Sequence, residues 1–492
     1  MMFLGIDVGT GGTRAVVIDE AGQLVATATV EHEPFASPQA GWAEQDPNDW
    51  WRAAVAAIRE VLAGDNVSAE QIAAVGFSGQ MHGAVLLDAA DEVLRPAIIW
   101  CDQRTEKQCR KLTEQIGAER LIELVCNPAI TGFTLPKLLW TRENEPDLWR
   151  QVRTVLLPKD YVRLRLTGDK ATDVADASGT LLFDVRKRAW SETMFAELGL
   201  DAGLFPRAFE SIEVTGTINA TGAAETGLLA GTPVVAGAGD NAAGAVGMGV
   251  TQAGAASVTI GTSGVVFVVT DKPTLDLQGR IHTLCHAIPQ RWHLTGVTQS
   301  AGLSLRWFRD NLGGGASFSE LTAEAENIPA GSDGLFWLPY LMGERTPHLD
   351  PHACAAFIGL TATHSRAHLT RAILEGVAFS LRDCLEIFRG LGLPLSGLKV
   401  GGGGAKSALW RQIQADIYGE TVSTIEAEEG AAFGAATLAG VGAGAWPSVD
   451  EACRQTIRVA QQTPPQPTIV AELNLRYEVY RKLYPALAPF FR

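Results

Sequence analysis

Ile6-Asp7-Val8-Gly9-Thr10-Gly11-Gly12 near the start of the chain is repeated in pattern by Val258-Thr259-Ile260-Gly261-Thr262-Ser263-Gly264 in its second half. Each copy alternates as a β-strand does, enters a glycine-rich turn and continues into a second strand. The second strands end at equivalent acids, Asp19 and Asp271, so the copies share one register for fourteen residues. We therefore predict a structural duplication whose second half begins near residue 246.

The two glycine-rich turns are candidate phosphate-binding loops. Their successive backbone amides and hydroxyls are not covered by bulky side chains, so a phosphate can approach closely. A single turn of this kind would be interpreted as an ordinary tight β-turn. Paired copies with the same polar residues favour a site that holds a nucleotide tail from both sides.

Length and composition restrict the class of protein. A chain of 492 residues is too long for one hydrophobic core and predicts at least two large domains. With 46% hydrophobic and 19% charged residues it has the composition of a soluble globular protein. The net charge of −15 and the pI near 5.1 argue against nucleic acid or an anionic membrane as partner. The negative net charge does not exclude a nucleotide ligand, because loop amides and a divalent cation can bind its phosphates at short range.

The cysteines and the chain ends indicate a cytoplasmic protein. Seven cysteines are widely spaced with no Cys-x-x-Cys pair, which favours a reducing compartment. The first residues have no basic region and include an acid at Asp7, unlike a secretory signal. The uncharged run from Gly430 to Trp446 is rich in Gly and Ala and too short to span a bilayer. We expect it to form a tightly packed helix.

The predicted elements give an α/β organisation. An antiparallel meander is expected at Phe3–Asp7, Arg14–Asp19 and Leu24–Val30, followed by a helix that begins at Asp46-Pro47. Further strands are expected at Ala73–Phe77 and Ala97–Trp100, and a final helix near Leu473–Leu483. The segment Gly237–Gly254, rich in Gly, Ala and Val, suits close backbone approach, and we place the cleft between the halves there.

Two acids occupy strategic positions. Asp7 precedes the first turn, where a carboxylate beside a triphosphate requires a divalent cation, so we predict an Mg²⁺ partner there. The alternative is an ordinary turn acid. Asp240, with Asn241, precedes an Ala-rich helix, and its alternative role is that of an N-cap. A carboxylate held at a helix start can also accept a proton from a hydroxyl, although the helix terminus would lower its pKa.

The segment Gly402–Ser407 superficially resembles a P-loop, but Ala405 stands where a glycine should precede Lys406 and Ser407. We interpret it as a glycine-lined wall for a flat adenine, with an ordinary strand-to-helix turn as the alternative.

Two histidine-containing segments are candidates for different kinds of ligand. His282, Cys285 and His286 are metal-ligating residue types, but strand alternation places His282 and Cys285 on opposite faces, which disfavours a metal site. His82, just after a buried strand, suits a polyhydroxylated ligand, which needs mixed donors and acceptors. Trp100 and Asp102 offer a flat apolar wall beside a hydrogen-bond acceptor.

Further segments resemble the signatures of the FGGY carbohydrate kinases, and the likeness spans essentially the whole chain. Gly132–Asn144 resembles the first signature of that family, and Ala355–Leu360 followed by His368–Gly376 resembles the second. The resemblance implies two ribonuclease-H-like α/β domains of the actin, hexokinase and heat-shock ATPase type. Their expected bounds are 1–245 and 246–492, with a cleft between them.

Four segments narrow the resemblance to the family members that phosphorylate D-xylulose. They are Ser78–Gly83, Leu157–Tyr161, Gly239–Gly244 and Gly343–His348. The implied reaction uses ATP to make D-xylulose 5-phosphate, a step of D-xylose catabolism. Cys101 departs from the pattern, because an Asn is expected there.

The resemblance also implies roles for individual residues. Asp240 would be the general base, beside the Mg²⁺ partner already predicted at Asp7, which would hold the ion directly or through water. The sugar contacts, together with the flat wall, would be Met81, His82, Trp100, Asp102 and Asn241. ATP would contact Thr10, Gly11, Gly12, Thr13, Gly261, Thr262, Ser263, Gly403, Gly404 and Ser407. The expected partners are the sugar and ATP, with no nucleic acid or membrane, while the oligomeric state, a homodimer included, stays open.

Three alternatives remain at this stage. One is a kinase for another ketose, polyol or aldonate, such as ribulose, gluconate or glycerol. Another is a nucleotide-dependent switch or chaperone, since the same nucleotide fold serves those functions. A third is a sugar-binding regulator without turnover, against which Asp7 and Asp240 argue.

Overall fold

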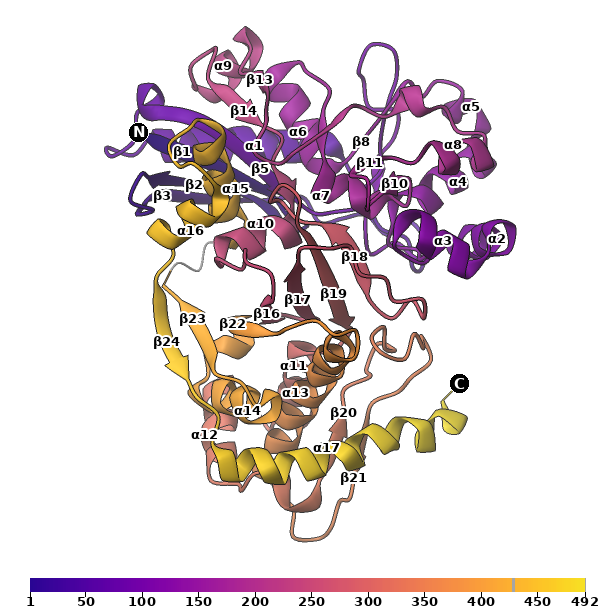
Figure 1. Ribbon diagram of the computed structural model, residues 1–492, viewed down its shortest axis with the longest axis vertical. Coiled ribbons are helices and arrows are strands. Elements are labelled where there is room, and N and C mark those ends of the chain that lie inside the picture. Colours follow the sequence, from indigo (N-terminus) through magenta and orange to yellow (C-terminus); the bar gives the residue numbers. More distant parts are fainter. Residues whose placement is uncertain (427–429, 492) are drawn as a thin grey trace.

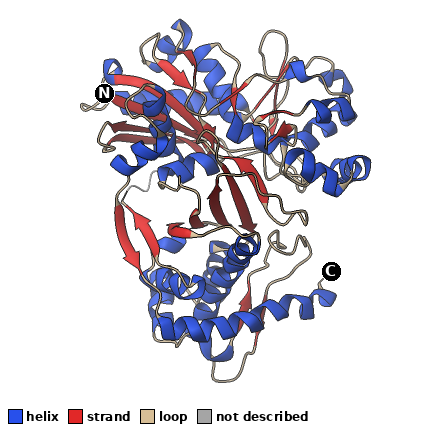
Figure 2. Cartoon of the chain, viewed as in Figure 1, coloured by secondary structure: helices blue, strands red, loops and turns tan. Residues whose placement is uncertain are grey.

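A computed structural model of the chain describes residues 1–426 and 430–491. Two large mixed β-sheets, each covered by helices, form the upper and lower parts of the molecule (Figures 1 and 2). The α/β class and the two-lobed architecture expected from the sequence are confirmed. Among the described residues, no helix combines the length and the apolarity that crossing a lipid bilayer requires.

The first sheet begins with the predicted antiparallel meander, formed by β1 (Met2–Val8), β2 (Gly12–Asp19) and β3 (Leu24–Glu31). The strand predicted at Ala73–Phe77 is β5 (Ile72–Gly79), which lies parallel to β1. On the far side of β5 lie its parallel neighbours β14 (Pro233–Val235) and β15 (Ala238–Gly239), and β13 (Val214–Thr217) forms the edge beyond β14.

The second sheet repeats this arrangement strand for strand. Its order β19-β17-β16-β22-β23 matches β3-β2-β1-β5-β14 of the first sheet, with the same parallel and antiparallel neighbours. These strands and their edge partners are β16 (Ala255–Ile260), β17 (Gly264–Thr270), β18 (His282–Cys285), β19 (Trp292–Thr298), β22 (Ser396–Gly402), β23 (Val422–Ile425) and β24 (Val459–Thr463). The duplication predicted from the repeated motif is confirmed.

The two hairpins differ in one respect from the sequence prediction. Val8 pairs with Thr13 in the first hairpin, whereas Ile260 pairs with Gly264 in the second. The second turn is therefore one residue shorter, and the shared register predicted over fourteen residues slips by one after the turn. A gapless match of glycine-rich segments cannot detect this, because glycine accommodates turns of either length.

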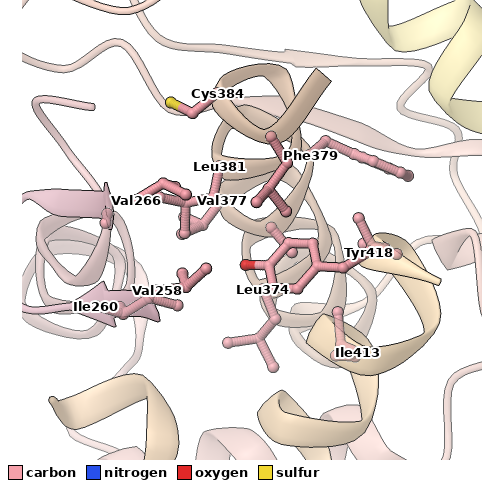
Figure 3. Packing of buried hydrophobic residues seen from close by; sticks show 14 of the residues in the cluster. Val258, Ile260, Val266, Leu374, Val377, Phe379, Leu381, Cys384, Ile413 and Tyr418 are labelled. Atoms are coloured by element: carbon pink, nitrogen blue, oxygen red, sulfur yellow. The ribbon is translucent and has the colours of Figure 1, made fainter. Parts of the chain in front are cut away.

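The core of the second sheet is built on the long helix α13 (Arg366–Gly390). Figure 3 shows Val258, Ile260 and Val266 of the sheet near Leu374, Val377 and Leu381 of this helix. Around this core lie the helices α11 (Gly302–Leu312), α12 (Phe318–Glu326), α14 (Ala408–Tyr418) and α17 (Pro467–Leu487). The last of these is the predicted C-terminal helix.

A pair of small-residue helices joins the two halves. α10 (Asp240–Gly247) packs so closely on α15 (Gly430–Gly442) that a Cβ added at Gly434 would overlap the carbonyl oxygen of Ala243. α15 also covers β1 and β5, although it comes from the second half of the sequence (Figure 1). The close approach predicted for both segments is confirmed. Residue 246, the predicted start of the second domain, lies inside α10, and that boundary stays a prediction.

The remaining elements complete the first lobe and the rims of the sheets. The predicted helix at Asp46-Pro47 is α1 (Pro47–Leu62), with Asp46 as its N-cap, and the strand predicted at Ala97–Trp100 shortens to β7 (Ala97–Ile98). The other helices are α2 (Glu106–Ile116), α3 (Ala118–Val125), α4 (Thr134–Asn144), α5 (Pro146–Trp149), α6 (Pro158–Thr167), α7 (Val174–Ala177), α8 (Glu192–Leu198), α9 (Ala220–Thr226) and α16 (Val449–Thr456). The other strands are β4 (Glu44–Gln45), β6 (Val85–Leu87), β8 (Thr154–Leu156), β9 (Thr172–Asp173), β10 (Phe183–Asp184), β11 (Ala189–Trp190), β12 (Ala208–Phe209), β20 (Phe336–Leu338) and β21 (Ala356–Ile358).

Candidate active site

The candidate site lies where three parallel strands of the first sheet end. Val8 of β1 pairs with Gly79 of β5, and Gly79 pairs with Gly239 of β15, so the carboxyl ends of these strands meet at one edge. The turn 9–12 follows β1, residues 81 and 82 follow β5, and Asp240 follows β15. Ligand sites of open α/β sheets form at such edges. The fold therefore brings the predicted phosphate turn, sugar residues and base together.

Asp240 is the first residue of α10, whose N-cap is Gly239, so the N-cap role considered for Asp240 is not the one it has. Its Oδ1 is buried without a hydrogen-bond partner among the described residues. Burial and the charge of Asp7 raise the pKa of Asp240 to about 7, against the lowering effect of the Asn241 amide. The helix terminus lowers the pKa as expected, but burial and the charge of Asp7 outweigh it, so the net shift is upward. A carboxyl group that titrates near neutrality and has a free oxygen can accept a proton.

Asp7 lies beside Asp240 and is also buried with one free oxygen, Oδ1. Burial raises the pKa of Asp7, with smaller opposing effects from Ser78 and Arg14. Two neighbouring carboxylates that face an anionic nucleotide repel both it and one another unless a cation lies between them. Free carboxylate oxygens are the donors that Mg²⁺ prefers, so the residues present fit that ion.

Met81, His82 and Asn241 form a continuous wall next to Asp240. Asn241 Nδ2 lies 3.5 Å from Met81 Sδ, and a Cβ added at Gly239 would lie 2.7 Å from Met81 Cγ. His82 has a left-handed backbone, with φ of 70°, and its Nδ1 lies 2.8 Å from the carbonyl oxygen of Gly179. Buried Lys137 donates to the carbonyl oxygen of His82 at 2.7 Å, which fixes this strained segment.

Trp100 links the predicted sugar wall to the first glycine turn. Its ring is 47% exposed, and its Nε1 donates to Thr10 Oγ1 at 2.9 Å. Thr10 Oγ1 in turn donates to Gln80 Oε1 at 3.2 Å, and the carbonyl oxygen of Thr10 accepts from Gln45 Nε2 at 2.8 Å. An aromatic face beside the phosphate turn is thus held in place by polar contacts on its edge.

Asp102 does not reach the cleft, which corrects its prediction as a substrate contact. The residue is 0% exposed, and its carboxylate accepts from the Ala43 amide and from the guanidinium of Arg104. Arg104 also stacks on Trp42 at 3.7 Å from the ring centroid. Asp102 therefore stabilises the segment that carries Trp100, and the sequence alone could not distinguish such support from contact.

The predicted nucleotide residues of the second half lie side by side. Ile260, just before the turn Gly261–Ser263, pairs with Gly402, and a Cβ added at Gly404 would lie 2.6 Å from Ile260 Cβ. The carbonyl oxygens of Gly261 and Thr262 accept from the first amides of α11, at 2.8 and 3.1 Å. Ser407 is the N-cap of α14.

In the first turn, Gly11 is exposed, but Thr13 is buried and hydrogen-bonded to His32 at 2.8 Å. The nucleotide contacts of these residues stay a prediction.

Sequence reasoning missed two polar side chains near this wall, Arg345 and His282. Arg345 belongs to the segment Gly343–His348, which served only to support the resemblance. His282 was weighed only as a metal ligand beside Cys285 and His286, whose Sγ and Nε2 contact the carbonyl oxygens of Val185 and Val250. Binding residues are often carried by loops, but the sequence does not show that this loop of the second half reaches the wall.

Two ribonuclease-H-like lobes with a glycine turn at each central hairpin are typical of nucleotide-binding proteins. The ionisable carboxyl group at the sheet edge favours, within that class, an ATP-dependent kinase of a small hydroxyl compound over a switch protein. Family models make the assignment specific. The FGGY family of carbohydrate kinases matches with its N-terminal domain over residues 2–247 and with its C-terminal domain over residues 256–443. The chain belongs to this family, as the resemblance implied, and is an ATP-dependent carbohydrate kinase.

Individual relatives are similar over nearly the whole chain. The chain is 40% identical to the xylulose kinase of Bacillus subtilis over 481 residues, which cover 98% of this chain and 96% of the relative. It is 41% identical to the xylulose kinase of Escherichia coli over 489 residues, which cover 99% of each. The structure of a xylulose kinase from Brucella ovis superposes with a TM-score of 0.94 at 38% identity and covers all of both chains.

Proposed function

We propose that this chain transfers the γ-phosphoryl group of ATP to D-xylulose and forms D-xylulose 5-phosphate and ADP. The observation that carries the proposal is the free Oδ1 of Asp240, on a carboxyl group with a pKa of about 7, beside Met81 and Asn241. The choice of sugar is supported by relatives named xylulose kinase at 40% and 41% identity over nearly the full chain.

In the proposed reaction the terminal hydroxyl of the sugar lies between Asp240 and the γ-phosphorus. Asp240 accepts the hydroxyl proton as the new O–P bond forms and the bond to the leaving ADP oxygen breaks. Phosphoryl transfer has a loose transition state, so positioning and charge stabilisation contribute more than base strength. The amides of the glycine turns would hold the phosphates, and Trp100 would hold the sugar against Thr10.

We propose Mg²⁺ as the metal, held by Asp7 directly or through water. When bound, the ion would neutralise the charge that develops on the phosphate oxygens. The free buried oxygen of Asp7 supports this role, since a buried carboxylate oxygen without a partner is costly. We also propose a cytoplasmic location, because all seven cysteines are free and a reducing compartment suits them.

A coupled ADP-release assay over pentuloses, aldonates and polyols tests the proposed substrate. We expect D-xylulose to have the highest kcat/KM of the panel. If ribulose, gluconate or glycerol has a higher kcat/KM, that compound and not D-xylulose is the preferred substrate. Turnover with no compound of the panel would contradict the proposed reaction itself.

Substitution of Asp240 tests the proposed base. Asp240→Asn keeps the shape of the side chain and should lower kcat by about 10²- to 10⁴-fold, the usual contribution of general base catalysis, with a smaller change in KM for the sugar. Asp271→Asn is a matched control, because this acid ends the equivalent second hairpin and is 67% exposed. Near-normal turnover of the Asp240 variant would remove the assignment.

A further inference from the structure

Arg345 places an unpaired cation at the edge of the candidate sugar site. It lies in the loop after β20, and burial lowers its pKa to about 10. Within residues 1–426 and 430–491 its guanidinium has neither an ion pair nor a hydrogen bond. The neighbouring Glu344 is turned away, since its Oε1 accepts from the backbone amides of Gln299 and Arg345. Arg345 Nη2 lies 3.9 Å from the Cβ position of Gly132, next to Trp100.

His282 supplies a second unpaired group at the same place. It lies on β18, is 6% exposed, and neither of its ring nitrogens has a hydrogen-bond partner in the described part of the chain. The rings of His282 and Phe133 form a T-shaped contact with 5.4 Å between their centroids. His82 makes a T-shaped contact with the same phenylalanine, at 4.7 Å. Burial, with the charge of Arg345, holds the pKa of His282 well below its usual range, so the ring is neutral.

A half-buried guanidinium and a buried imidazole, both without partners among the described residues, suit a bound ligand. A buried donor or acceptor without a partner costs about 1–3 kcal/mol, and a charged one costs more. Arg345 presents a planar fork of N–H donors, and neutral His282 presents one donor and one acceptor. The ligand must therefore carry closely spaced oxygen acceptors and at least one hydroxyl donor, and it cannot be a metal cation.

The order of contacts along the wall decides which part of the sugar lies there. Asn241, next to Asp240, contacts Met81, and His82 follows Met81 and contacts Phe133. Phe133 in turn contacts His282, whose pKa is lowered in part by the charge of Arg345. Arg345 and His282 thus lie at the far end of the wall from the proposed base, opposite the hydroxyl that reacts.

We propose that Arg345 and His282 bind the non-reacting end of a linear ketose, with the fork of Arg345 on the carbonyl oxygen and His282 on the adjacent hydroxyl. This assignment rests on the proposed function. An aldonate carboxylate would also suit the fork of Arg345, and the hydroxyl next to it could donate to His282, so the choice of a ketose rests on the proposed substrate and not on these two side chains. A carbonyl next to a hydroxyl satisfies both side chains.

The two residues also tie substrate binding to the arrangement of the lobes. Arg345 and His282 come from the part matched by the C-terminal family domain, whereas His82 and Phe133 come from the part matched by the N-terminal domain. A sugar that contacts both sets bridges the two halves. Binding energy at the far end of the sugar can therefore order the site before phosphoryl transfer, which limits wasteful hydrolysis of ATP.

The test compares D-xylulose with xylitol, which has the same carbon chain but no carbonyl, in wild type and Arg345→Lys. Lysine keeps the charge but loses the planar fork, so KM for D-xylulose should rise about 10- to 100-fold. KM or Ki for xylitol should change by less than about 3-fold. Arg345→Gln should show the same loss of preference for the ketose, whereas His282→Phe should raise KM for D-xylulose and xylitol alike, because both carry the hydroxyl that His282 contacts. Arg280→Lys is the matched control, because its guanidinium is paired with Asp276.

Several outcomes would overturn the assignment. Equal losses for D-xylulose and xylitol in the Arg345 variants would show a general effect on the site, and unchanged constants in all three variants would show no contact. If wild type instead prefers an aldonate and Arg345→Lys removes that preference, the fork binds a carboxylate. Failure of wild type to phosphorylate D-xylulose would contradict the proposed function alone, and the same comparison would then use the accepted ketose and its polyol.

Discussion

Asp7 and Asp240 have the same side chain and lie at the same sheet edge, but their surroundings suggest different roles. Asp7 lies within β1, where its strand neighbours are Ser78 and Arg14, while Asp240 begins a helix next to the sugar wall. Burial raises the pKa of both carboxyl groups, and only Asp240 lies next to the sugar wall. Asp240, with a pKa of about 7, is the one suited to exchange a proton at neutral pH.

The pKa of Asp240 predicts how activity depends on pH. Only the ionised carboxylate can accept a proton, so the kcat/KM for the sugar, at saturating Mg·ATP, should fall on the acid side of the pKa of Asp240. That pKa is about 7 without a cation, and Mg²⁺ at Asp7 would lower it by offsetting the charge of Asp7. The slope should approach tenfold per pH unit, since one group is protonated. Asp271→Asn should show the same acid limb. A profile with no acid limb above about pH 4, the usual pKa of an aspartate, would contradict the raised pKa of Asp240.

At the scale of residues, the sequence predicted the position of a side chain where the backbone alone places it, while the roles of these residues stay predictions. Asp240, Met81 and His82 directly follow strands, so their place at the sheet edge follows from strand order. Asp102 failed because its partner Arg104 turns the carboxylate into the interior. Arg345 was missed because a loop from the second half carries it to Gly132, and no local pattern encodes that contact.

At the scale of elements, the crossing of α10 and α15 depends on glycine. A Cβ at Gly434 would overlap backbone atoms of Ala243, so Gly434→Ala should destabilise the protein by about 2–3 kcal/mol, measured by urea unfolding. Gly244→Ala is the matched control, because a Cβ there meets nothing within 4 Å and alanine favours a helix by about 1 kcal/mol. Equal stability of the two variants would show that the crossing is not tightly packed.

A second element-scale prediction concerns the junction of α13 and α17. Tyr477 donates to Asp383 at 2.5 Å, and burial raises the pKa of Asp383 to about 7. The folded state therefore keeps a proton that the unfolded chain releases above about pH 4, and stability falls as pH rises from there to about 7.

Asp383→Asn keeps an acceptor for Tyr477 but has no proton to lose. Its stability relative to wild type should therefore increase between about pH 4 and pH 7, by at most about 4 kcal/mol, and then level off. Parallel stability curves for variant and wild type would contradict the raised pKa.

The sequence predicted the elements of the first lobe well and the boundaries between elements less well. The meander and α1 follow from strand alternation and from the cap at Asp46, which are local signals. The shorter second turn and the placement of α15 on β1 depend on contacts between distant segments. The Gly and Ala composition of α15 indicated close packing, but not against which sheet.

At the scale of the whole molecule, 40 basic and 55 acidic residues give a net charge of −15, so the mean field opposes the approach of anionic Mg·ATP. The glycine turns attract phosphate only at short range, and D-xylulose is neutral. Raising the ionic strength from about 0.01 M to 0.15 M shortens the Debye length from about 30 Å to about 8 Å and screens the long-range repulsion. We therefore expect KM for Mg·ATP to fall about 2- to 3-fold over this range while KM for D-xylulose stays constant. The sugar serves as the internal control, since a change in both constants would indicate an effect of salt on the fold. A rise in KM for Mg·ATP alone would show that local cations at the turns, and not the net charge, govern nucleotide binding.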